Sequence, residues 1–189
     1  ALHAAAEEYL VKGTELIEFI GRTYEEYQLT EDDVIDKLIP ACEALDMFMD
    51  DNLISEYMEE SVVRFTDPEL KGVYGTADFI GGSEDGKTVF VLDFKFGHKI
   101  VNPVENAQGL FYGAAAYQDP STSDLFDKCE TVVIGIIQPT NDESCITSWE
   151  TTPARLDSFV YELKKALKES ESDEAKVAEG KECTFCPAK

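Results

Sequence analysis

The stretch GVYGTADFIGGSEDGKTVFVLDFKF, residues 72–96, decides the fold. Two runs rich in β-branched and aromatic residues, 72–80 and 87–96, flank a loop that contains Asp85-Gly86, a dipeptide typical of hairpin turns. The second run includes Val89-Phe90-Val91-Leu92, which is apolar at every position and therefore suits a strand covered on both faces. We expect two antiparallel neighbours here, the second of them central in a sheet.

Hydrophobic spacing and cap residues predict further elements on both sides of this hairpin. They comprise helices over 1–20 and 31–50, a strand over 56–66, a helix from Asn102-Pro103 to residue 117, strands over 130–138 and 144–150, and a last helix from Thr152-Pro153. Thr30 is the expected cap of the second helix, and Pro40 is expected to kink or break it. This order predicts an α/β (mixed α+β) fold with a central mixed sheet flanked by helices.

The length of 189 residues allows one domain, which we place at 1–170, followed by a polar tail over 171–189. An apolar fraction of 43% excludes wholesale disorder. No apolar run is long enough to span a membrane, and residues 1–20 do not resemble a secretory leader, so we do not expect secretion. Five scattered cysteines argue against a disulfide framework, so we expect a reducing, cytoplasmic location.

The net charge of −23 is concentrated at the two ends of the chain. Residues 1–70 carry a net charge of −15, whereas residues 71–118 carry −1. Acidic flanks of this kind are typical of solvated helix faces. Binding to a phosphate backbone depends on Lys and Arg, so any contact with nucleic acid must use a local groove, a bound cation or a partner protein.

Candidate chemistry lies at the end of the expected central strand. Asp93 and Lys95 are two positions apart, so their side chains share a face, and the hairpin register could bring Asp78 beside Asp93. Two adjacent carboxylates repel each other, and a divalent cation such as Mg²⁺ or Mn²⁺ would relieve the repulsion. Lys95 could then orient a water or offset charge on a phosphate. The spacing alone fits equally a structural Asp–Lys pair at a strand end.

Three motifs resemble the PD-(D/E)xK nuclease superfamily, and in particular its RecB-like, Cas4-like branch and a phage-associated, DUF2800-like group within it. They are G-T-A-D at 75–78, L-D-F-K-F-G at 92–97, and Q-x-x-x-Y from Gln108 to Tyr112. The resemblance covers about 40 residues in the order that this branch shows. It implies a restriction-endonuclease-like core and a Mg²⁺- or Mn²⁺-dependent deoxyribonuclease.

The resemblance also implies roles for individual residues. Asp78 and Asp93 would bind the metal together with the carbonyl of Phe94, and Lys95 would support the attacking water. His3, on an early helix, resembles a histidine that joins the metal site in this branch; a surface histidine at a helix end is the other interpretation. Gln108 and Tyr112 would contact substrate or support the site, and Lys99 could meet a phosphate. Glu60, in the first strand, could face the site, but a surface acid is the favoured interpretation.

Cys183 and Cys186 resemble the carboxyl-terminal part of a cysteine cluster in the same branch. A 4Fe-4S cluster or a closed zinc site needs four ligands, and this chain supplies two at the matching place. We therefore expect a complete iron–sulfur or zinc site only in a longer chain; the other interpretation is a bare CxxC tail.

The sequence thus predicts a metal-dependent DNA nuclease, an exonuclease, that acts on single-stranded DNA or duplex ends in phage DNA processing, recombination or repair. A recombination or replication protein is an expected partner, and for a phage protein the location would be the bacterial host cytoplasm. The alternative is a non-catalytic acidic protein on the same fold that binds a basic partner or mimics DNA.

Overall fold

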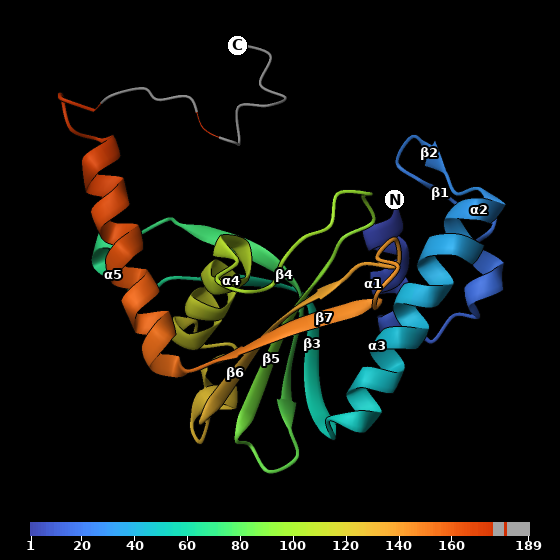
Figure 1. Cartoon of the computed structure of the whole chain (residues 1–189), viewed down its shortest axis with the longest axis horizontal. Coiled ribbons are helices and arrows are strands. Elements are labelled where there is room, and N and C mark those ends of the chain that lie inside the picture. The colour runs from blue at the N-terminus through green and yellow to red at the C-terminus, as the bar shows by residue number, and fades with distance from the viewer. Residues whose placement is uncertain (176–179, 181–189) are drawn as a thin grey trace.

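The computed structural model describes residues 1–175 and residue 180. The expected cluster ligands Cys183 and Cys186 lie outside these described residues. The core is a five-stranded sheet in the order β3-β4-β5-β6-β7, as Figure 1 shows. Its strands are β3 (Ile54–Arg64), β4 (Tyr74–Ser83), β5 (Thr88–Phe94), β6 (Thr131–Ile137) and β7 (Ile146–Thr151).

The strand directions make this a mixed sheet. β5 and β6 run parallel, and every other pair of neighbours in the sheet is antiparallel. The expected hairpin of residues 72–96 is confirmed as β4 and β5, with Phe79 opposite Leu92 and Gly82 opposite Val89. β5 is buried along nearly its whole length, as its uninterrupted apolar run predicts.

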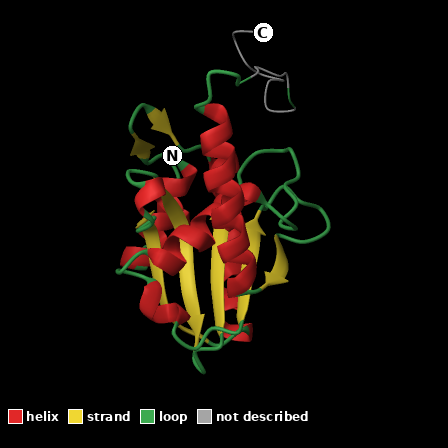
Figure 2. Cartoon of the chain, turned by 90° about the vertical axis from the view of Figure 1, so that its left-hand side faces the viewer, coloured by secondary structure: helices red, strands yellow, loops and turns green. Residues whose placement is uncertain are grey.

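Helices cover both faces of the sheet (Figure 2). One hydrophobic cluster joins the sheet to α4 (Ala107–Gln118) and α5 (Pro153–Ser170), through buried residues such as Leu110 and Leu156. A second cluster joins the other face to α1 (Leu2–Lys12) and α3 (Ile39–Asp51), through residues such as Ala6 and Leu45. The fold is therefore the α/β sandwich of helices and mixed sheet that the sequence predicts.

The amino-terminal region differs from the prediction in its details. The expected helix over 1–20 ends at Lys12, because Gly13 adopts a left-handed conformation and caps it. A 3₁₀ turn, η1 (Leu16–Phe19), follows, and the expected connection holds a short hairpin of β1 (Thr23–Tyr24) and β2 (Tyr27–Gln28). These elements depend on local turn chemistry that hydrophobic spacing does not reveal.

The second helical region is continuous rather than broken at Pro40. It runs through α2 (Glu31–Asp33), a π-helical turn η2 (Val34–Leu38) and α3, and Pro40 lies in the first turn of α3. The wider π turn lets the chain pass a residue that has no N–H to donate. Thr30 caps this region as expected, and its side chain forms a reciprocal capping box with Asp33.

The start of α4 is a correction to the prediction. Asn106 caps this helix by accepting a hydrogen bond from the N–H of Gly109 at 3.0 Å, whereas Asn102 accepts one from the N–H of Val104 in a preceding turn. Both asparagines are competent caps, and Glu105, at φ 52°, reverses the chain between them.

The short turns η3 (Pro68–Leu70) and η4 (Ser123–Phe126) complete the described elements. Over the described residues, none of the helices combines the length and apolar character needed to span a bilayer.

Gly109 lets α4 approach the sheet closely, and this contact provides a test of the packing. A Cβ at this position would lie 2.3 Å from Cγ2 of Ile134 on β6, so Gly109→Ala should destabilise the protein by about 1–3 kcal/mol. Denaturant unfolding measures the loss. Gly97→Ala is the control, since its Cβ meets nothing within 4 Å; an equal effect of both substitutions would contradict close packing as the cause.

Candidate metal and active site

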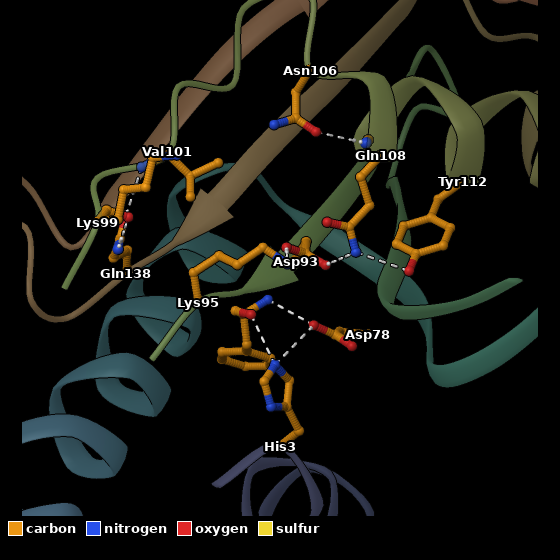
Figure 3. A network of polar contacts seen from close by, with 12 residues as sticks. His3, Asp78, Asp93, Lys95, Lys99, Val101, Asn106, Gln108, Tyr112 and Gln138 are labelled. Carbon is orange, nitrogen blue, oxygen red and sulfur yellow. Dashed lines mark hydrogen bonds and ion pairs between the residues drawn. The ribbon is translucent and has the colours of Figure 1, made fainter. Parts of the chain in front are cut away.

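Four elements bring polar side chains together at one end of the hairpin (Figure 3). Asp78 comes from β4, and Asp93 comes from the end of β5, with Lys95 directly after it. His3 reaches the same place from the first turn of α1, and Gln108 from the first turn of α4. Residues that are more than 100 positions apart in the sequence thus meet at one site.

Asp93 is the most deeply buried charge of the site, with a side chain 7% exposed. Its Oδ2 forms an ion pair with Lys95 Nζ, and its Oδ1 accepts a hydrogen bond from Nε2 of Gln108 at 3.1 Å. Apart from that ion pair, Oδ2 has no hydrogen-bond partner although it is buried. A buried carboxylate oxygen is costly unless it is paired, and Lys95 is the described residue that pairs with this one.

Asp78 lies beside Asp93 and is held by the backbone. Its Oδ2 accepts a hydrogen bond from the N–H of Phe94 at 2.7 Å, which ties β4 to the end of β5 beyond their last paired residues. Burial and, secondly, the charge of Asp93 raise the pKa of Asp78. Burial also raises the pKa of Asp93, despite the opposing effect of Lys95. Two carboxylates therefore share one ammonium in a region of low polarity.

His3 closes the site from the side of α1. Its Nε2 lies 2.9 Å from the carbonyl oxygen of Phe94 and 3.9 Å from Oδ2 of Asp78. The ring also packs edge-on against Phe96, with centroids 5.2 Å apart. His3 is thus held in place by its neighbours rather than projecting freely, although about half of its side chain is exposed.

The donor set suits a small divalent cation. Among residues 1–175 and 180, no three or more His, Cys, Asp or Glu side chains form a preformed metal cage. The site instead combines two carboxylates with the Phe94 carbonyl, and Mg²⁺ and Mn²⁺ prefer oxygen ligands of this kind. Binding of a cation by Oδ2 of Asp93 would replace the contact of this oxygen with Lys95.

The Gln108 and Tyr112 pair lies on the α4 side of the site. Nε2 of Gln108 contacts both Asp93 and the Tyr112 hydroxyl, the latter at 2.9 Å. Tyr112 is in turn fitted against β4, because a Cβ on Gly75 would lie 2.8 Å from its ring. This chain of contacts fixes the orientation of the Asp93 carboxylate.

Lys99 is not part of this inner group. Its side chain is exposed on the loop after β5, and Gln138, a buried residue, holds that loop. Nε2 of Gln138 donates to the carbonyls of Gly97 and Lys99, at 2.7 and 3.0 Å, while its Oε1 accepts from the N–H of Val101. Sequence reasoning missed Gln138; its only signal is a polar residue directly after a buried apolar strand.

Glu60 is a correction to the expectation of a surface acid. It is partly buried on β3, and burial, followed by the charge of Asp78, raises its pKa. Its φ of 41° lies in the left-handed region, which is unusual for a glutamate in a strand. Glu60 therefore adds a third carboxylate at the edge of the site.

The crowded carboxylates imply that the site lowers stability when no cation is present. The folded-state pKa of Asp78 is raised, so its ionised form costs stability at neutral pH, and the cost disappears as the pH falls through that value. We expect Asp78→Asn to raise the melting temperature at pH 7 in a chelator, but not at acidic pH. Thermal unfolding at both pH values measures this difference.

Asp85→Asn serves as the matched control. Hydrogen bonds from the Lys87 N–H and the Ser83 hydroxyl lower the pKa of Asp85, so its replacement should give no increase at either pH. A stabilisation by Asp85→Asn equal to that of Asp78→Asn, or none by either, would rule out carboxylate crowding.

Comparison with known proteins assigns the chain to a family. No curated protein matches the sequence significantly. Among solved structures, one from Eubacterium rectale named "Putative exonuclease" aligns with 9% identity and a TM-score of 0.47, over 95% of this chain and 74% of its own. Another, named SSO0001, aligns with 16% identity and a TM-score of 0.33, over 67% of this chain and 56% of its own. Likenesses this weak carry no information about activity. A family model, in contrast, matches residues 25–189, a range that contains Asp78, Asp93 and Lys95, and the chain belongs to the family described as "Protein of unknown function (DUF2800)".

Proposed function

We propose that this protein is a metal-dependent DNA nuclease of the PD-(D/E)xK type, in the RecB-like, Cas4-like branch. The observation that carries the proposal is the buried meeting of Asp78, Asp93 and Lys95 at the end of β5. A purely structural Asp–Lys pair would not need a second buried carboxylate beside it, because that carboxylate only adds repulsion.

The residues that would hold the cation are Asp78, Asp93 and the carbonyl of Phe94, with His3 as a further ligand. When bound, Mg²⁺ or Mn²⁺ supplies an activated water and a positive charge beside the scissile phosphate. The Phe94 carbonyl is rigidly placed, since the Phe94 N–H is held by Asp78 in the adjacent strand. For His3 to act as a ligand, its Nε2 must be neutral and must exchange the Phe94 carbonyl contact for the metal.

Lys95 would act on the reacting groups. Its ammonium lies against Asp93 and is about one quarter exposed, so it faces both the buried carboxylate and the open side of the site. In this position it can orient the attacking water or offset the negative charge that builds up on the phosphoryl oxygens. Gln108 acts as a positioning residue, because it holds the other oxygen of Asp93.

Cleavage of end-labelled linear DNA in Mn²⁺ tests the proposed activity. We expect Lys95→Ala and Asp93→Asn each to lower the initial rate at least about 100-fold, since each removes charge that stabilises the transition state or its metal. Lys87→Ala is the matched control, because this lysine precedes the opposite end of β5 and pairs with exposed Glu130. Release of single nucleotides from an end would identify an exonuclease, and internal fragments an endonuclease.

Calorimetric titration with Mn²⁺ tests the cation site independently of activity. The wild type should bind with measurable heat, whereas Asp78→Asn and Asp93→Asn should bind much more weakly. Binding to all three proteins with equal affinity, or unchanged cleavage by Lys95→Ala and Asp93→Asn, would refute the proposal.

A non-catalytic acidic protein that binds a basic partner is the second candidate. The net charge of −15 over residues 1–70 favours it. This candidate requires that the protein cleaves DNA in neither Mg²⁺ nor Mn²⁺ and that it does not bind Mn²⁺.

A further inference from the structure

A strip of one sheet face leads away from Asp78 along β3 and β4. The antiparallel register pairs Val62 with Thr76 and Arg64 with Tyr74. Gly75 and Ala77 face α4, since a Cβ on Gly75 would contact Tyr112 and Ala77 belongs to the cluster on that side. Alternation along a strand therefore places Tyr74 and Thr76 on the opposite face, which is the side from which His3 reaches Asp78.

This strip is open and carries an aromatic ring. Tyr74 is 65% exposed and Val62 is 38% exposed, so neither is covered by a helix. Tyr74 lies four residues from Asp78, or about 13 Å along an extended strand. An exposed aromatic ring at this distance from the candidate site is a surface on which a planar ligand can stack.

Arg64 lies on the strip and Lys71 lies in the connection just before β4, and no described carboxylate forms an ion pair with either. Arg64 and Lys71 are both exposed, and neither forms a salt bridge within the described part of the chain. The nearby Asp119 accepts a hydrogen bond from the backbone N–H of Arg64, and the charge of Arg64 contributes to lowering its pKa.

The acids of the turn between β3 and β4 are occupied elsewhere. Asp67 and Glu69, in the turn between β3 and β4, form ion pairs with Lys164 of α5, and Glu69 also pairs with Lys168. The lysines of α5 thus neutralise the acidic turn, so Asp67 and Glu69 do not form ion pairs with Arg64 or Lys71.

We propose that Tyr74, Arg64 and Lys71 form a binding track for an unpaired nucleic-acid strand that leads to the site at Asp78 and Asp93. This proposal rests on the proposed nuclease function. A base stacks on the Tyr74 ring, the two cations contact phosphates, and Val62 offers apolar surface between them. An unpaired strand suits this track better than a duplex, because its base faces are free to stack and few cations are available for a double backbone.

Fluorescence anisotropy with a fluorescein-labelled 20-nucleotide oligothymidine tests the track. The titrations are done in a chelator, so that binding is measured without cleavage. Tyr74→Ala should weaken binding roughly 5- to 150-fold, the loss of one stacked base, whereas Tyr74→Trp should bind as well as the wild type. Tyr161→Ala is the matched control, since Tyr161 is 72% exposed but lies on α5. Thermal unfolding checks that each variant is folded.

Salt dependence gives a second readout that a purely structural effect would not change. Arg64→Ala should reduce the slope of the logarithm of affinity against the logarithm of salt concentration by about 0.7, the value for one phosphate contact on a single strand. A blunt 20-base-pair duplex should bind more weakly than the single strand.

The outcomes separate this inference from the proposed function. The proposed track would be overturned if the wild type, Tyr74→Ala and Arg64→Ala bind the oligonucleotide with equal affinity. Tighter binding of the blunt duplex than of the single strand would also overturn it, even if Mn²⁺-dependent cleavage is observed. Tyr74-dependent binding with no cleavage in Mn²⁺ would instead reject the nuclease and retain the track as a single-strand binding surface.

Discussion

The structure depends on the burial of two carboxylates beside a single ammonium at the end of β5. The side chains of Asp78 and Asp93 are 12% and 7% exposed, and among the described residues Lys95 alone forms an ion pair with Asp93. Such an arrangement leaves negative charge uncompensated in a poorly polarisable environment. The protein tolerates it because the surrounding framework is apolar and closely packed on both faces of the sheet. Sites that bind a cation commonly lower the stability of the ion-free protein in this way, and binding of the ion restores that stability.

The framework explains why the site occurs where it does. β4 and β5 form the hairpin that supplies both carboxylates, while the parallel pairing of β5 with β6 places the end of β5 deep in the sheet. α4 and α1 then approach from opposite faces, each with one side chain that touches the acidic pair. Each part of the site is therefore fixed by a different layer of the fold.

Much of this arrangement follows from the sequence alone. The hairpin of residues 72–96, the buried character of β5 and the cap at Thr30 depend on local patterns, and local patterns are visible in a sequence. The wrong start for α4 shows the limit of that reasoning, since Asn102 and Asn106 are equivalent caps by residue type. Gln138 was missed, and Glu60 was interpreted as a surface acid, because their positions depend on loop contacts and strand register, which only the assembled sheet determines. The roles assigned to the site residues and the proposed cofactor stay predictions.

The position of His3 has a practical consequence. This residue belongs to the first turn of α1, which contacts β3 of the sheet and buries the small residues Ala5 and Ala6. Any segment attached ahead of residue 1 would emerge within a few residues of the acidic pocket. A purification tag attached ahead of residue 1 would compete with the site for metal ions and distort the measured metal affinities, and a histidine-rich tag would do so most. A carboxyl-terminal tag is therefore the better choice for metal titrations.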